Sequence, residues 1–245
     1  GTGDINVGTV ITSSNTGNAG PINIGTTGNI TTDNLSADSN AGNAADITVN
    51  GGGNVTTGTV RTSSNGGFSS NISLSAGGDL VADNLVTSSN GHRAGDITTS
   101  SGGNTTVGFI AAGSNGGNGG AVNATAGGDL NTNHNTFNSK GGNGRTLTAI
   151  ANNGALTTGA INVSSSNQQG GSVNTSSQSA IIGGAINANG STNGGTVNIT
   201  VQNPLTIGGA GGGSSIAGDV TADGGTGNGG TIAFFSQGGL AQDAG

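Results

Sequence analysis

A three-residue signature recurs every 25 residues along this chain. The signature is Gly, then Asp or Asn, then an aliphatic residue or Thr, and it starts at Gly3, Gly28, Gly53, Gly78, Gly103 and Gly128. Beyond that point it continues with small slips at Gly154, Ser179 and Asn203. A disordered chain has no reason to keep a fixed register. A period of this length predicts a solenoid built from stacked coils.

Apolar residues fall into three short stretches of each repeat. The first holds Ile5, Ile30, Val55, Leu80, Leu130, Leu156, Ile181 and Leu205; the second holds Val10, Leu35, Val60, Leu85, Ile110, Ile161 and Ile186; the third holds Ile22, Ile47, Ile72, Ile97, Val122, Leu147, Val173 and Val197. Smaller or apolar residues two positions later put both members on one face of a strand. The pattern predicts an all-β, parallel β-helix with three short strands per coil, three sheets and about nine coils.

We expect a single domain over residues 1–245. Regular coils occupy residues 3–202, an enlarged coil occupies 203–237, and a further coil starts at 238–245. The enlarged coil contains a Gly/Ser-rich stretch at 208–215, which is typical of a surface loop.

Two corners of each coil carry characteristic residues. The corner between the first and second stretches holds residue types that favour a left-handed backbone: Gly8, Asp33, Gly58, Asp83, Gly108, Asn133, Gly159 and Gly184. The second corner carries Asn15, Asn40, Asn65, Asn90 and Asn115 at the same 25-residue step. Stacked Asn side chains predict a hydrogen-bonded ladder, although duplication of one turn-tolerant Asn would give the same pattern.

Composition excludes several classes of partner. The chain has 4 basic and 11 acidic residues and a net charge of −7, so it cannot neutralise a nucleic-acid backbone. No apolar run is long enough to span a bilayer as a helix, so no membrane insertion is expected. Because the chain lacks Cys, a disulfide framework is excluded.

The segments Gly77-Gly78-Asp79-Leu80 and Gly127-Gly128-Asp129-Leu130, with the Ser-Ser-Asn corners, resemble the repeat region of filamentous-haemagglutinin-type bacterial exoproteins. Many proteins of this family are exported by two-partner secretion. The resemblance implies a right-handed β-helix, an extracellular or cell-surface location and a role as adhesin shaft or surface filament. The secretion domain of the family is not evident, which suggests a piece of a longer chain.

No catalytic, cofactor-binding or metal-binding residues are predicted. Paired carboxylates on neighbouring coils would be needed for a polysaccharide lyase or hydrolase. Asn104 instead separates Asp79 from Asp129 in the stack, and the chain has no Tyr or Trp to stack against sugars. His92 and His134 stand at different positions of different repeats, which argues against a shared metal.

One repeat departs from the pattern and offers a weak ligand patch. Asn135 stands where an aliphatic residue belongs, and His134, Phe137, Lys140 and Arg145 cluster in the same repeat. A basic and aromatic patch could hold an acidic glycan. Alternatively, Phe137 turns inward to fill the volume that Asn135 leaves, and the charges decorate a solvated corner.

The expected function is that of a structural or adhesive segment of a secreted or cell-surface solenoid, with host or matrix glycans as partners. A variant is a filament protomer that stacks on copies of itself, because neither end resembles a polar cap. The alternative from another class is an ice-binding solenoid, suggested by Thr pairs at Thr31-Thr32, Thr56-Thr57, Thr105-Thr106 and Thr157-Thr158. A polysaccharide-processing enzyme is the least favoured reading.

Overall fold

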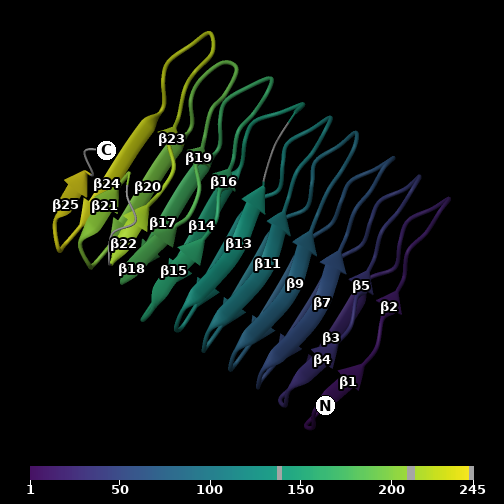
Figure 1. Cartoon of the computed structure of the whole chain (residues 1–245). Coiled ribbons are helices and arrows are strands. Elements are labelled where there is room, and N and C mark those ends of the chain that lie inside the picture. Colours follow the sequence, from purple (N-terminus) through teal and green to yellow (C-terminus); the bar gives the residue numbers. More distant parts are fainter. Residues whose placement is uncertain (137–139, 209–212, 243–245) are drawn as a thin grey trace.

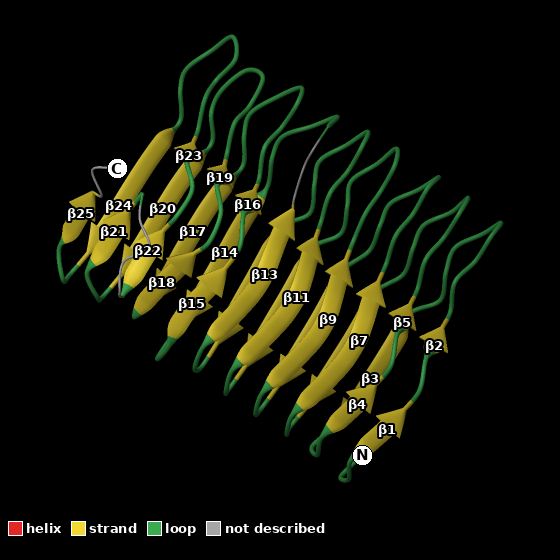
Figure 2. Cartoon of the chain, in the orientation of Figure 1, coloured by secondary structure: helices red, strands yellow, loops and turns green. Residues whose placement is uncertain are grey.

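The computed structural model describes residues 1–136, 140–208 and 213–242, and it is a parallel β-solenoid (Figures 1 and 2). All regular elements in this part of the chain are strands, and it contains no helix that could cross a membrane. The strands of the first half are β1 (Ile5–Val7), β2 (Val10–Ile11), β3 (Ile22–Thr26), β4 (Ile30–Thr32), β5 (Leu35–Ser36), β6 (Ile47–Gly51), β7 (Val55–Arg61), β8 (Ile72–Ala76), β9 (Leu80–Val86), β10 (Ile97–Ser101), β11 (Thr105–Ala111) and β12 (Val122–Ala126). Those of the second half are β13 (Leu130–Thr136), β14 (Thr146–Ala151), β15 (Ala155–Thr158), β16 (Ile161–Asn162), β17 (Ser172–Ser177), β18 (Ser179–Ile182), β19 (Ile186–Asn187), β20 (Thr196–Val201), β21 (Leu205–Ile207), β22 (Ser214–Ile216), β23 (Val220–Thr221), β24 (Thr231–Ser236) and β25 (Leu240–Gln242).

Each pass of the chain lies on the previous one, so residues one repeat apart are paired. In the nine-stranded sheet, which runs from β3 to β24, Ile47 pairs with Ile72 and Ile72 with Ile97. The first and second apolar stretches belong together to a sixteen-stranded sheet. The expected parallel all-β solenoid is therefore confirmed, but the described strands form two sheets instead of three.

The corner between the first two stretches differs from the prediction. In β7, β9, β11 and β13 the chain passes through this corner as one seven-residue strand. Along β7 the alternation of buried and exposed residues slips once, at Gly58 and Thr59, and then resumes at Val60. The strand thus bends without leaving its ladder.

The expected left-handed backbone at this corner is wrong. Within the described residues, positive φ occurs only at Gly208, Gly213 and Gly239. A Cβ at Gly108 would instead meet the carbonyl oxygen of Asp83 in the preceding coil. Close approach of the neighbouring coil, and not backbone handedness, explains the glycine there.

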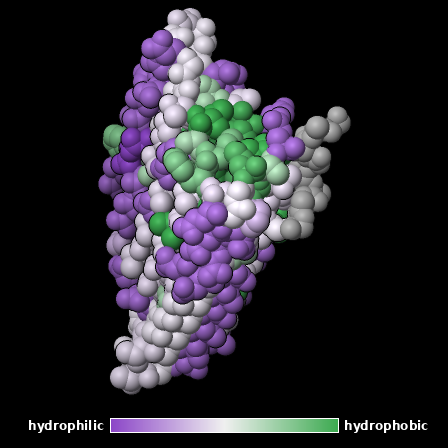
Figure 3. All heavy atoms as spheres, turned by 90° about the vertical axis from the view of Figure 1, so that its left-hand side faces the viewer, coloured by the Kyte–Doolittle hydropathy of each residue, from purple (hydrophilic) through white to green (hydrophobic). Residues whose placement is uncertain are grey.

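Inward aliphatic side chains form one continuous core along the stack. All eight residues of the third stretch, from Ile22 to Val197, are at most 4% exposed. Figure 3 looks at the C-terminal end of the stack, where apolar atoms gather in the middle and polar ones at the rim. One assignment was wrong: Ile181 is 45% exposed, because Ala180 pairs with Leu156 and takes the inward position.

The enlarged coil adds a strand to the stack. Strand β22 lies between β18 and β21 and pairs in parallel with both, although β21 precedes it in the chain. Ser214, Ser215 and Ile216 are buried, so the end of the expected Gly/Ser surface loop is a core strand. Gly208, directly after β21, and Gly213, directly before β22, both have a positive φ.

Candidate functional site

The Gly-Asp/Asn signature is a structural device. The Oδ1 atom of Asn29 accepts the backbone N–H of Asn54 at 2.8 Å, and the Oδ1 atom of Asn54 accepts that of Asp79 at 2.9 Å. A Cβ on Gly78 would overlap Asn54 Oδ1, so the glycine makes room for the side chain below it. Asp and Asn are interchangeable here because only an acceptor oxygen is required. The sequence reading missed this role, although the alternation of Asp and Asn at one position was its signal.

A second ladder lies at the Ser-Ser-Asn corner, where the asparagine spacing predicts it. The Nδ2 atom of each Asn donates to Oδ1 of the Asn one coil earlier. The distances are 3.5 Å for Asn40 to Asn15, 2.7 Å for Asn65 to Asn40, 2.7 Å for Asn90 to Asn65 and 2.8 Å for Asn115 to Asn90. These side chains are exposed, so each keeps hydrogen-bonding capacity toward solvent.

Buried serines fix the backbone next to this ladder. The hydroxyl of Ser64 donates to the carbonyl of Gly42 at 2.7 Å and accepts the N–H of Gly67 at 2.8 Å. Ser39 and Ser89 make the equivalent bonds in the neighbouring coils. Because each hydroxyl links two coils, the exposed asparagines stand on a rigid backbone.

Two hollows follow one another along this corner and together form what we call the corner groove. The first has a volume of about 240 Å³ and is lined by segments 13–15 and 38–40 with Arg61, Ser63 and Asn65. The second, of about 370 Å³, is lined by Val86, segments 88–90 and 113–115, Ala111 and Lys140. The second continues the first because Val86, Ser88 and Asn90 stand one repeat beyond Arg61, Ser63 and Asn65.

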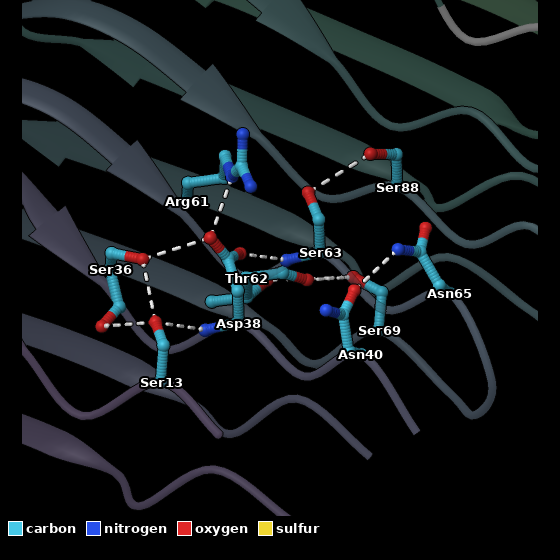
Figure 4. A network of polar contacts seen from close by, with 10 residues as sticks. All are labelled: Ser13, Ser36, Asp38, Asn40, Arg61, Thr62, Ser63, Asn65, Ser69 and Ser88. Atoms are coloured by element: carbon cyan, nitrogen blue, oxygen red, sulfur yellow. Dashed lines mark hydrogen bonds and ion pairs between the residues drawn. The ribbon is translucent and has the colours of Figure 1, made fainter. Parts of the chain in front are cut away.

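A polar network occupies the first hollow (Figure 4). Asp38 Oδ2 accepts from Ser36 Oγ at 2.8 Å and from Arg61 Nε at 2.7 Å, and its Oδ1 accepts the N–H of Ser63 at 2.5 Å. The hydroxyl of Ser13 accepts the N–H of Asp38 at 3.1 Å and lies 2.9 Å from the hydroxyl of Ser36. Both carboxylate oxygens are therefore engaged, and the Asp38 side chain is only 17% exposed.

The guanidinium of Arg61 is bonded to Asp38 through its Nε atom. Its side chain is 52% exposed, and in Figure 4 the single dashed line at Arg61 joins it to Asp38. Within the described residues its two terminal nitrogens make no hydrogen bond, so they are available above the groove. Arg93 differs, since its terminal Nη2 binds both oxygens of Asp96, at 2.5 and 2.7 Å.

Of the predicted patch of His134, Phe137, Lys140 and Arg145, the structure describes the side chains of Lys140 and Arg145. His134 lies in β13, opposite Phe109, and Phe137 lies outside the described residues. Lys140 is exposed in the corner groove, whereas Arg145 is half-buried just before β14. Lys140 stands 25 residues after Asn115, at the next position of the asparagine column, and this spacing could have placed it in the groove.

The suggestion that Phe137 fills the volume left by Asn135 concerns a residue outside the described part of the chain. Asn135 itself points inward and is 2% exposed. Its Nδ2 donates to the hydroxyls of Thr132 at 2.9 Å and Thr158 at 2.7 Å. Its Oδ1 has no hydrogen-bond partner among the described residues.

The other candidates form no chemical centre in the described part of the chain. No three His, Cys, Asp or Glu side chains there lie close enough to hold one metal ion. Asp79 and Asp129 accept backbone N–H groups of the next coil, at 2.7 and 2.8 Å. The Thr pairs each bury one member, as Thr32 and Thr57 illustrate, so they present one Thr per coil.

No protein-family model, curated protein or solved structure matches this chain. The corner groove combines a polar side-chain network with two exposed basic side chains, and this chemistry indicates what it can bind.

Proposed function

We propose that this chain is a structural and adhesive segment of a secreted or cell-surface β-solenoid protein. Its work is to span distance as a stiff rod and to present a surface to glycans. Assembly with further copies of itself into a filament is the variant of the same proposal.

One observation carries this proposal: the described coils are joined by repeated side-chain ladders at several corners as well as by the sheets. The Asp/Asn signature, the exposed asparagines and the buried serines each bond one coil to the next. Such bonding resists local opening and bending because any separation of two coils breaks all these bonds together. A small charge content also leaves the surface poor in cleavage sites for proteases that require Lys or Arg.

Immunogold electron microscopy of the source cells tests the location and the form. Antibodies against the purified chain should label intact, unpermeabilised cells on extended structures outside the envelope. Labelling confined to the interior of sectioned cells would overturn the proposal.

Ice binding stays a second candidate because of the outer face of the nine-stranded sheet. Two outward columns cross this face without a charged residue: Asn23, Thr48, Ser73, Thr98, Asn123, Thr148, Asn174, Asn198 and Ala233, and beside them Gly25, Asn50, Ser75, Ser100, Thr125, Ile150, Ser176, Thr200 and Phe235. Regular rows of small hydroxyl and amide groups, about 4.8 Å apart from strand to strand, could order water in a lattice. A thermal-hysteresis measurement decides: clear activity would favour this candidate, and its absence at high protein concentration would remove it.

A further inference from the structure

We propose that the corner groove binds an acidic polysaccharide whose charges are sugar carboxylates, with the glycan lying along the solenoid axis. Arg61 receives one carboxylate and Lys140 receives another. This inference rests on the adhesive half of the proposed function and names its ligand class.

Arg61 has the geometry of a carboxylate receptor. Asp38 holds it through Nε at 2.7 Å, and within the described residues the two terminal amino groups have no hydrogen-bond partner. A guanidinium pairs with a planar carboxylate through two parallel hydrogen bonds, and fixing its orientation beforehand reduces the entropy lost on binding.

The second cation lies in line with the first. Lys140 belongs to the coil three steps beyond that of Arg61, a separation of about 14 Å along the stack. Its ammonium makes no ion pair within the described residues. The two groups together are two of the four basic residues in the chain.

Between the cations the groove offers neutral polar groups. Asn65, Asn90 and Asn115 spend one donor and one acceptor on the ladder at most, and each keeps a free N–H and lone pair toward solvent. The hydroxyl of Ser63 in the first hollow lies 3.0 Å from the hydroxyl of Ser88 in the second, so the polar lining continues from one hollow to the next. Regularly spaced amides and hydroxyls suit the ring hydroxyls of a sugar chain.

Charge balance favours carboxylates over phosphate or sulfate clusters. The residues that line the two hollows include one carboxylate, Asp38, against the two cations. This is a weakly positive strip on a chain of net charge −7. A glycan with several phosphate or sulfate groups on each ring would be repelled by the rest of the surface, whereas an oligomer with one carboxylate per ring carries less charge and can place one carboxylate at each cation.

Calorimetric titration with a tetramer of α-1,4-linked galacturonic acid tests the proposal on the full chain. At neutral pH the unmodified protein should bind the tetramer with free carboxylates, called the acid form below, and the fully methyl-esterified tetramer should bind at least about tenfold more weakly. Arg61→Gln should weaken binding of the acid form about tenfold and Lys140→Gln by a few-fold. Arg61→Lys should fall between Arg61→Gln and the unmodified protein, because it keeps the charge and loses the planar pair.

Arg93→Gln is the matched control, because Arg93 also pairs with an aspartate but lines neither hollow. It should leave binding unchanged. Equal loss with Arg93→Gln and Arg61→Gln, equal affinity for the esterified tetramer, or no binding by the folded protein would each overturn the proposal. Circular dichroism of every variant verifies folding. The gold-labelling experiment reads location alone, so a failed titration leaves the surface-segment proposal standing.

Discussion

At the scale of single residues, Asn135 interrupts an otherwise aliphatic column of the core. It pairs with Ile110 on one side and Ile161 on the other, and its buried Oδ1 has no partner in the part of the chain that the structure describes. An unsatisfied buried acceptor costs about 1–3 kcal/mol, and a buried aliphatic side chain is favourable by a similar amount. We therefore expect Asn135→Leu to raise the free energy of unfolding by about 1 kcal/mol.

Chemical denaturation measures this change. The opposite sign would mean that the bonds from Asn135 to the hydroxyls of Thr132 and Thr158 are worth more than the orphaned oxygen costs.

Ile72 represents the ordinary members of the core. It is 1% exposed and lies between Ile47 and Ile97 in the nine-stranded sheet. Ile72→Asp places a charge in an apolar interior without a partner and should cost more than about 3 kcal/mol. Ser73→Asp puts the same side chain on the outer face of the same strand and should cost less than about 1 kcal/mol. Similar thermal melting of the two variants would contradict the assignment of the two faces.

At the scale of elements, the stability contributed by the asparagine ladder can be measured separately from that contributed by the strands. Asn65 donates to Asn40 and accepts from Asn90, both at 2.7 Å. Loss of these exposed bonds in Asn65→Ala should lower the free energy of unfolding by about 1 kcal/mol. Asn123→Ala is the control, because Asn123 is also exposed and makes no side-chain hydrogen bond within the described residues. If both variants melt alike, the ladder contributes no stability of its own.

A deletion tests whether the extra strand β22 is needed to keep the coils stacked. Deleting residues 208–217 places Val220 five positions after Leu205, the spacing that separates Leu80 from Leu85. Strand β21 could then take the place of β22 beside β18 with Leu205 and Ile207 still inward. We expect the deletion variant to fold with a β-rich circular dichroism spectrum.

A matched deletion of residues 83–92 removes the same number of residues from a regular coil. It destroys the 25-residue register there, so it should melt at a clearly lower temperature. Equal loss of structure in both deletions would mean that β22 is an essential part of the stack.

Parallel stacking, the 25-residue pairing and most of the core follow from the sequence because inward aliphatic residues recur at a fixed step. Two of the features that did not follow show why. The bend at Gly58 within β7 needs no turn, and periodicity cannot distinguish a bent strand from two strands. Likewise Lys140 was grouped with its neighbours in sequence, whereas the stack groups it with Asn115 and the groove.

At the scale of the whole molecule, charge contributes little to the fold. In the described part of the chain two ion pairs are present, Arg61 with Asp38 and Arg93 with Asp96, and both are partly exposed. Exposed pairs contribute about 0–1 kcal/mol each, and salt screens them. Raising sodium chloride from about 0.05 M to about 1 M should therefore change the free energy of unfolding by less than about 1 kcal/mol.

In contrast to folding, glycan binding in the corner groove should be sensitive to salt, because it depends on the attraction of carboxylates by Arg61 and Lys140. The same increase in salt should weaken the galacturonate tetramer severalfold while the melting temperature stays nearly constant. Parallel titrations and melting curves across this salt range measure both quantities on one sample. A melting temperature that falls together with affinity would show that the ion pairs stabilise the stack. Affinity that is constant across the salt range would show that the glycan is held by the amides and hydroxyls of the groove, and not by its two cations.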